Sequence, residues 1–261
     1  MNEKHTFAIC AYKESEYLEL CIQSIQEQTK KSQVIMCTST PNKLINTLAE
    51  KYRIPLYINT GDKGITQDWN FALRKSSTKY VTIAHQDDIY ESTYTEKMVK
   101  SLDMQDDCII GFSNYYEIRN GNNINKNKIL RIKRYMNIVF KISSKNKFIR
   151  RRVISLGDPI CCPAVIFNRE KCPDFWFNNE YKVSCDWEAW SRLAEEKGRF
   201  IYIDEQLMGH RIYEDSTTTE MIKNGVRLQE DKNIYQRYWP DWMVKILLSQ
   251  YKKSMDSNTV K

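Results

Sequence analysis

Two hydrophobic periods alternate in the N-terminal part of this 261-residue chain, and few folds accommodate that order. Short apolar runs typical of β-strands occur at His5–Ala11, Gln33–Thr38, Ile54–Asn59 and Lys79–His85. Between them, apolar residues recur at helical spacing. Thr40 and Pro41 are expected to open the second helix, and Thr66 to cap the third. Strands that alternate with helices form crossover units, so the sequence predicts an α/β fold with a mostly parallel central sheet flanked by helices.

In the remainder of the chain, the signals that mark where helices and strands begin and end are weaker. Further strands are expected at Cys108–Ile118, Cys162–Phe167, Arg199–Ile203 and Gln206–Ile212. Helical pieces are expected in the basic stretch 126–152, a helix over Val183–Gly198, and mostly helical structure over Glu214–Lys261. The order suggests one fused domain with a ligand-binding half (1–115), a second half (116–215) and a helical C-terminal segment (216–261).

Composition limits the class of protein. The chain is 41% hydrophobic, with 16 Tyr, 9 Phe and 6 Trp, which supplies a core and excludes wholesale disorder. No apolar run reaches the ~18–20 residues of a membrane-spanning helix, and the N-terminus lacks a signal-peptide pattern, so a cytoplasmic location is expected. The eight cysteines show no paired spacing for a metal and are expected to be reduced, mostly buried thiols.

Positive charge is concentrated in one segment. The formal net charge is +7, yet no acidic residue occurs between Ile118 and Gly157, and residues 126–152 carry eleven Lys or Arg interleaved with apolar residues. Such a segment indicates an anionic partner, and we expect peripheral docking at the inner face of an anionic membrane. A solvated face of a soluble enzyme and a nucleic-acid-binding surface remain the alternatives, although no known nucleic-acid-binding motif is present.

Acidic residues follow the strand that ends at His85. In open parallel sheets, ligands bind beyond the carboxyl ends of the strands, and here His85 runs into Gln86, Asp87 and Asp88. Adjacent carboxylates are costly without a neighbouring positive charge, and Mg²⁺ or Mn²⁺ shared with a diphosphate is one answer. A helix N-terminus, where Asp is also favoured, explains the same residues equally well.

Several segments in order resemble a known family. The opening FAICAYKESEYLELCIQSIQEQT, then GITQDWNFAL, HQDDIYES, CDWEAWSRL and HRIYEDSTT are similar to motifs of the family 2 glycosyltransferases, which have the GT-A fold. The resemblance implies transfer of a sugar from a nucleotide-diphospho-sugar to an acceptor hydroxyl, inverting and metal-assisted. It also implies a role in surface polysaccharide or lipid-linked glycan synthesis.

The resemblance also implies residue roles. Asp186 would be the general base, which removes the proton of the acceptor hydroxyl. Asp87 and Asp88 would hold the metal. Trp187, His210 and Arg211 would face the acceptor or a phosphate. The donor would be bound by Ala11, Tyr12, Glu14, Ser39, Gly64, Asp68, Asn70, Gln86, Asp87 and Asp88. From the residues alone, Asp186 would instead be a helix-start carboxylate and Trp187 a core side chain.

The chain departs from the family pattern at two places. The stretch after the second strand, Cys37–Thr40, lacks the usual acidic residues, so the nucleobase is not indicated. His85 occupies the first acidic position of the family's D-x-D motif, which leaves fewer carboxylates for a metal. A catalytically silent relative that binds a nucleotide or a partner protein therefore remains an alternative.

Overall fold

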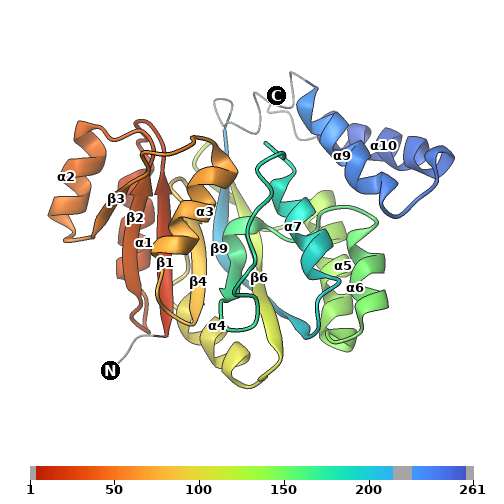
Figure 1. The fold of residues 1–261 in the computed structure, drawn as a ribbon, viewed down its shortest axis with the longest axis horizontal. Helices are drawn as coiled ribbons and strands as arrows, with labels where there is room; N and C mark the ends of the chain where they lie inside the picture. Colours follow the sequence, from red (N-terminus) through yellow and green to blue (C-terminus); the bar gives the residue numbers. More distant parts are fainter. Residues whose placement is uncertain (1–3, 214–224, 257–261) are drawn as a thin grey trace.

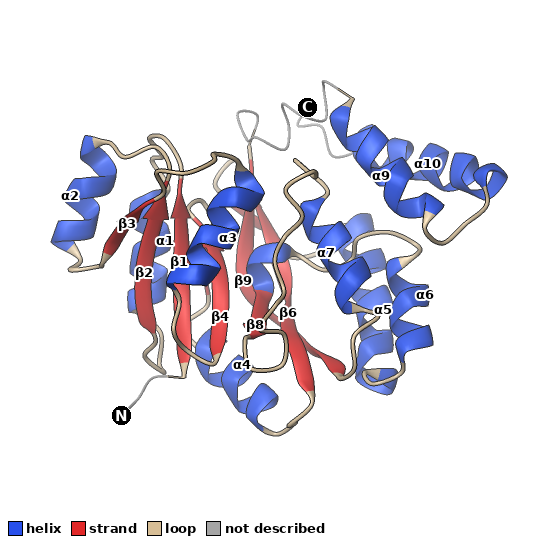
Figure 2. Cartoon of the chain, in the orientation of Figure 1, coloured by secondary structure: helices blue, strands red, loops and turns tan. Residues whose placement is uncertain are grey.

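The protein is described by a computed structural model that covers residues 4–213 and 225–256 (Figure 1). One mixed β-sheet runs through the described chain, with helices on both of its faces (Figure 2). Its strands lie in the order β3-β2-β1-β4-β8-β6-β9-β5, and β7 pairs with β6 outside this path.

The N-terminal half forms the parallel side of the sheet. β1 (His5–Ala11) and β2 (Gln33–Thr38) have the predicted bounds, while β3 (Leu56–Ile58) and β4 (Tyr80–His85) are shorter than predicted. β1 pairs in parallel with both β2 and β4, and β2 pairs in parallel with β3. The intervening helices are α1 (Leu18–Gln26), α2 (Lys43–Lys51) and α3 (Ile65–Lys75). The predicted crossover order is confirmed.

Two helix starts differ from the sequence expectation. Asn42, rather than Thr40, caps α2, because its side chain accepts a hydrogen bond from the Ile45 N–H at 3.0 Å. Gly64 caps α3 at a φ of 150°, which favours glycine, and Thr66 is buried in the first turn. In both cases the helix is capped by a residue that lies two positions from the one expected from capping preference.

The second half adds antiparallel pairs that the sequence pattern did not indicate. β8 (Val165–Asn168) lies antiparallel between β4 and β6 (Cys108–Arg119). β9 (Arg199–Ile212) pairs in parallel with β6 and antiparallel with β5 (Ile89–Tyr90), and β7 (Asn122–Ile124) extends β6. β6 crosses residue 115, so the sheet itself joins the two expected halves.

The structure corrects the strand predictions for residues 162–167 and 199–212. A single strand, β9, replaces the two short strands, because a shift in register against β6 absorbs the residues between Ile203 and Gln206. The run that begins at Cys162 starts with a short 3₁₀ turn, η1 (Cys162–Ala164), before β8.

Helices dominate the remaining segments. The expected helical pieces of the basic segment are α5 (Lys128–Ser143) and α6 (Lys147–Ile154), and α4 (Tyr94–Asp103) follows β5. The later helices are α7 (Cys185–Leu193), α9 (Val226–Gln236) and α10 (Asp241–Asp256). The expectation of helix at 214–224 lies outside the described residues. No helix within the described ranges combines the length and apolar character that crossing a bilayer requires.

Arg150 corrects the expected docking role of the basic segment. Its side chain is fully buried and donates hydrogen bonds to main-chain carbonyls, among them those of Ala194 at 3.3 Å and Ser144 at 3.3 Å. Burial lowers the pKa of this guanidinium. Arg150 therefore satisfies carbonyls where α7 ends and cannot contact a membrane surface.

Two hydrophobic cores lie on opposite faces of the sheet. Along β1, Phe7 and Ile9 point to the core under α1, α2 and α4, whereas Ala8 points to the core under α3 and α7. Because both faces are covered, β1 reads as a continuous apolar run. All eight cysteines are free thiols and six are buried, as the sequence predicted.

Candidate active site

The acidic residues after β4 form a compact cluster with His85. One potential ligand atom from each of His85, Asp87 and Asp88 lies within 4.8 Å of the others. Asp88 is fully buried, although its carboxylate would normally be hydrated. β4 is parallel to β1, so its carboxyl end lies at the same edge as that of β1. The side chains predicted at this strand end therefore lie together, and His85, which departs from the family pattern, is one of them.

The far strand β9 supplies the partners of Asp88. Asp88 Oδ1 accepts a hydrogen bond from the Arg211 N–H at 2.9 Å and lies 3.1 Å from His210 Nδ1. This arrangement follows from β5, which comes directly after Asp88 and pairs with β9 at Gly209. The two segments are more than a hundred residues apart, and the strand pairing brings His210 and Arg211 to the acidic cluster.

Electrostatics set the charge state of the cluster. Burial lowers the pKa of His85, partly against the Asp88 charge, which favours a neutral imidazole. Burial also lowers the pKa of His210, but the charge and hydrogen bond of Asp88 outweigh it, so the net pKa is raised. Burial, followed by the charge of Asp88, raises the pKa of Asp87. Two neighbouring carboxyls in this setting favour a bound cation.

The donor atoms fit a divalent metal. Asp88 Oδ2 and His85 Nε2 are buried and have no hydrogen-bond partner within the described part of the chain. Such orphaned polar atoms need a partner, which a cation would supply. Carboxylate oxygens with an imidazole nitrogen suit Mn²⁺, and carboxylates alone suit Mg²⁺. His85 is held in place by stacking on Trp69, with ring centroids 5.1 Å apart.

A guanidinium lies beside the cluster. Arg211 Nε donates to the Asp87 carbonyl at 2.9 Å, and its guanidinium carbon lies 4.1 Å from the centroid of the Tyr17 ring. The rings of Tyr17 and Tyr213 are 5.5 Å apart. Arg211 is thus oriented on an aromatic face next to the acidic residues, where a phosphate could meet it. The sequence predicted Arg211 at a phosphate but did not indicate Tyr17 or Tyr213.

Gln86 fixes the chain that follows β1. Its side chain accepts from the Tyr12 N–H and donates to the Tyr12 carbonyl, both at 2.9 Å. The ring of Tyr12 is left 43% exposed at the edge of the site. Of the other predicted donor residues here, Ala11 is buried and Glu14 is exposed. The structure therefore places the Tyr12 ring, rather than Ala11, at the surface that a donor could contact.

A second carboxylate sits where β2 and β3 end. Asp68 of α3 accepts hydrogen bonds from Ser39 Oγ at 2.6 Å and Asn59 Nδ2 at 2.8 Å. Ser39 follows β2, Asn59 follows β3, and Gly64 begins the helix that carries Asp68. Asp68 and Ser39, both predicted at the donor site, are in direct contact, and Asn59 is the member that the sequence did not indicate.

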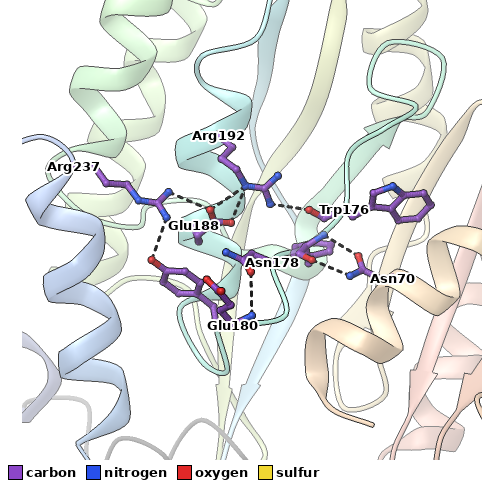
Figure 3. Close-up of polar contacts among 9 residues, drawn as sticks. Asn70, Trp176, Asn178, Glu180, Glu188, Arg192 and Arg237 are labelled. Atoms are coloured by element: carbon purple, nitrogen blue, oxygen red, sulfur yellow. Dashed lines mark hydrogen bonds and ion pairs between the residues drawn. The ribbon is translucent and has the colours of Figure 1, made fainter. Parts of the chain in front are cut away.

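Asn70 connects α3 to the loop before α7. Its side chain accepts a hydrogen bond from the Phe177 N–H at 2.8 Å and donates one to the Phe177 carbonyl at 2.9 Å, and Figure 3 marks the contacts of Asn70 with this loop. On the other side of this loop, Arg192 donates to the Trp176 carbonyl and to Glu188. Asn70, predicted to bind the donor, thus has both of its polar atoms engaged in holding this loop against α3.

Asp186 lies in the first turn of α7 and is half-buried. Its neighbour is Asp158, a buried residue that the sequence did not indicate. Burial, followed by the charge of Asp186, raises the pKa of Asp158. After burial, the charges of Asp88, Asp158 and Asp186 each raise the pKa of Cys161. The charges of three carboxyls therefore act on one thiol, and the charge of Asp186 also acts on His85 of the acidic cluster.

Helix α9 holds the segment that precedes Asp186. The Glu230 carboxylate accepts the N–H groups of Lys182, Val183 and Ser184 at 2.7, 3.0 and 2.8 Å. Ser184 Oγ also donates to Asp231 at 2.6 Å. The sequence did not indicate these carboxylates as site residues, because their partners lie 46 or 47 positions away in the chain, or 48 in the case of Lys182.

Trp187 does not face the site. Its side chain is 1% exposed, and its Nε1 donates to the Ile154 carbonyl at 2.9 Å. The ring packs edge-on against Tyr235, at a centroid separation of 4.7 Å. Trp187 therefore belongs to the core beneath α7, in line with the interpretation from the residues alone rather than with the acceptor role that the resemblance implied.

Known proteins are similar to this chain in sequence and in fold. The model of the family described as Glycosyl transferase family 2 matches residues 6–172. "Glycosyltransferase GlyA" of Streptococcus pneumoniae is 30% identical over 122 residues, which are 44% of this chain and 17% of GlyA. The chain thus spans less than a fifth of that relative.

Solved structures resemble the whole described fold. S. aureus TarS 1–349 in complex with UDP-GlcNAc has a TM-score of 0.64 at 16% identity, covering 95% of this chain and 71% of that one. Mannosyltransferase PcManGT from Pyrobaculum calidifontis, in complex with GDP-Man and Mn²⁺, has a TM-score of 0.64 at 14% identity, covering 95% and 68%. Likeness at these identities concerns the fold, and it confirms the predicted GT-A architecture.

Proposed function

The chain belongs to glycosyl transferase family 2, and on that basis we propose that it moves a sugar from a nucleotide-diphospho-sugar to an acceptor hydroxyl. The observation that carries the proposal is the cluster of His85, Asp87 and Asp88 at the carboxyl end of β4. A buried carboxylate with an unpartnered oxygen, beside an oriented guanidinium, fits a metal-bound diphosphate. The complexes of TarS with UDP-GlcNAc and of PcManGT with GDP-Man and Mn²⁺ support the same ligand class.

The diphosphate would lie between the acidic cluster and Arg211. Asp87 and Asp88, with His85, would hold Mg²⁺ or Mn²⁺, which when bound neutralises charge on the departing diphosphate. The raised pKa of His210 favours its protonated form next to Asp88, and the contact of its Nδ1 with Asp88 Oδ1 would orient this carboxylate. Arg211 would contact a phosphate through the guanidinium edge that its bond to the Asp87 carbonyl leaves open.

The nucleoside would lie over the ends of β1, β2 and β3. The exposed Tyr12 ring offers a stacking surface at the end of β1. Asp68, held by Ser39 and Asn59, places a carboxylate where the segment after β2 has none of its own. We therefore expect Asp68 to take part in donor recognition, with Ser39 and Asn59 fixing its orientation.

Asp186 would act as the general base. As the acceptor oxygen attacks the anomeric carbon, its proton passes to the Asp186 carboxylate and the bond from that carbon to the diphosphate breaks. Attack opposite to the departing diphosphate inverts the configuration. Asp158, whose pKa is raised by burial and by the charge of Asp186, would hold a proton and could donate it in a hydrogen bond that orients the base. Positioned general-base assistance is worth roughly 10²–10⁴ in rate.

The acceptor class is proposed on chemistry alone. A growing surface polysaccharide or a lipid-linked glycan would present both a sugar hydroxyl and, for the lipid-linked form, a phosphate. The cationic helices α5 and α6 lie in the same half of the molecule as Asp186 and could attract such an anionic acceptor (Figure 1).

Ligand-observed NMR of the full chain against a panel of nucleotide-diphospho-sugars tests the proposal. Each donor is measured with and without Mn²⁺ and Mg²⁺, alongside Asp87→Asn and the exposed control Asp106→Asn. We expect metal-dependent binding of one donor that Asp87→Asn loses and Asp106→Asn retains. Failure to bind any donor would reject the transferase, and binding without turnover would instead favour a silent nucleotide-binding relative.

A further inference from the structure

A groove lies between α6 and the segment that joins α9 to α10. Its volume is about 560 Å³, and its lining includes Lys147, Phe148, Arg151, Arg152, Arg237 and Tyr238. None of these residues belongs to the acidic cluster or to the Asp186 pair. Four cations around one groove indicate an anionic ligand.

Two of the four cations are already compensated. Arg151 lies 3.3 Å from a carboxylate oxygen of Glu195. Arg237 donates hydrogen bonds to the buried Glu188 and to the Tyr181 hydroxyl, each at 3.1 Å. Figure 3 shows Arg237 directed at Glu188. The positive charges of these two arginines are therefore largely offset, and their main contribution is to the shape of the groove.

The other two cations keep their charge available. Across the described residues, no carboxylate comes within ion-pair distance of Lys147 or Arg152. The Arg152 guanidinium instead lies between two rings, 5.3 Å from the centroid of Phe148 and 4.9 Å from that of Trp239. Cation–π contacts orient a guanidinium without neutralising it, so Arg152 stays ready for an anion.

Apolar side chains flank the charged groove. Phe148 is 64% exposed and Leu156, after the end of α6, is 50% exposed. Ile142 near the end of α5 is 84% exposed. Large apolar side chains beside unpaired cations suit a ligand that is itself amphipathic, with a phosphate next to hydrocarbon.

We propose that this groove binds the phosphate of an anionic phospholipid and docks the chain on a membrane surface. Lys147 and Arg152 would contact the phosphate, while Phe148 and Ile142 enter the headgroup region. The docking surface is then the end of α5, the α6 groove and Trp239, rather than the whole of 126–152. Docking through this groove extends the proposed function. It rests on that function only in that docking would bring the chain to a lipid-borne acceptor.

Co-sedimentation of the full chain with vesicles tests the docking. Phosphatidylcholine vesicles are compared with vesicles that also contain phosphatidylglycerol, and no donor is present. The double variant Lys147→Glu/Arg152→Glu should lower partitioning to the anionic vesicles roughly 30-fold, since each cation contributes about 1 kcal/mol near such a surface. Donor binding by NMR should be unchanged, which separates failure here from failure of the transferase proposal.

A second groove of this chain provides the matched control. It has a volume of about 590 Å³ and is lined by Lys30 and Lys100 together with Glu96 and Asp103. Lys30→Glu/Lys100→Glu makes the same change in net charge and should bind anionic vesicles much more strongly than Lys147→Glu/Arg152→Glu. Phe148→Ser keeps every charge and should still weaken partitioning severalfold, also at high salt.

Four outcomes would overturn the proposal. One is equal vesicle binding by wild type and Lys147→Glu/Arg152→Glu, and another is equal loss in both double variants. A third is protection by inorganic phosphate in thermal unfolding without vesicle binding, which would indicate a soluble phosphate ligand. The fourth is retention of an oligonucleotide, lost in Lys147→Glu/Arg152→Glu, without vesicle binding, which would indicate nucleic acid.

Discussion

The two acidic clusters of this protein differ in what surrounds them. Asp87 and Asp88 lie beside His210 and Arg211, and one buried oxygen of Asp88 has no hydrogen-bond partner in the described structure. Asp158 is buried, and burial with the Asp186 charge raises its pKa. The first cluster suits a cation and phosphates, and the second suits a proton. The same residue type thus acquires two roles through its neighbours.

Replacing the proposed base separates the two clusters most clearly. Asp186→Asn should lower kcat by roughly 10²–10⁴, because the amide cannot accept the acceptor proton. Donor binding measured by NMR should remain, whereas Asp87→Asn should lose it. Release of the nucleoside diphosphate, followed over time, measures the turnover.

Asp158→Asn serves as the matched variant for Asp186→Asn, because an amide resembles a protonated carboxyl and should keep most of the activity. Loss of donor binding in Asp186→Asn would contradict the separation and make the two clusters a single site.

Removing the carboxylate that holds the start of α7 should act next most strongly. Glu230→Ala leaves the N–H groups of residues 182–184 without their acceptor and should lower the free energy of unfolding by about 2–3 kcal/mol. We also expect a lower kcat at unchanged donor affinity, since Asp186 follows directly. Urea denaturation measures the change in stability, and separate measurements of kcat and of donor affinity measure the effect on activity.

Glu50→Ala, an exposed change in α2, is the control for Glu230→Ala and should leave both quantities unchanged. Glu230→Gln keeps an oxygen acceptor and should recover part of the loss. A fall in donor affinity as large as the fall in kcat would show that α9 supports the whole fold rather than Asp186.

The smallest effect concerns pH. Burial raises the pKa of Asp231 to about 6, against the opposing charge of Arg227. Because this value exceeds that of an unfolded Asp, the folded chain binds an extra proton between about pH 4 and 6, and its free energy of unfolding falls as the pH rises through that window. Asp231→Asn should remove this loss and be more stable than wild type by about 1–2 kcal/mol at pH 7.5.

Urea denaturation of wild type and Asp231→Asn at pH 4 and pH 7.5 tests the sign. The difference should be small at the lower pH, where Asp231 is protonated in the folded state and about half protonated in the unfolded state. A variant that is less stable than wild type at pH 7.5 would show that the Arg227 contact, at 3.7 Å, outweighs the cost of burial.

Local signals explain why part of the candidate site was predictable. Asp87 and Asp88 come directly after a buried strand, and the carboxyl end of a parallel strand is where ligands bind. Asp186 was found through the resemblance of CDWEAWSRL to a family motif, and the structure places it in the first turn of α7. Each of these signals is contained in a few consecutive residues.

Distant contacts explain what was missed. Asp158 and Glu230 carry no local signal, because their roles depend on α7 lying against segments far away in the chain. Arg150 sits within a run of exposed cations, and only the packing of α6 on α7 buries it. A charge pattern in the sequence shows which segment is cationic, but it does not show which of its side chains are buried.

The sequence by itself determined the order of strands and helices in the N-terminal half, the family, and the acidic end of β4. These features follow from hydrophobic period and from motifs that neighbouring residues share. Only the tertiary structure decided that β9 returns beside β5, so that His210 and Arg211 reach Asp88. It also decided that Asp158 meets Asp186, because strand pairing and helix packing between distant segments are fixed by the free energy of the whole fold.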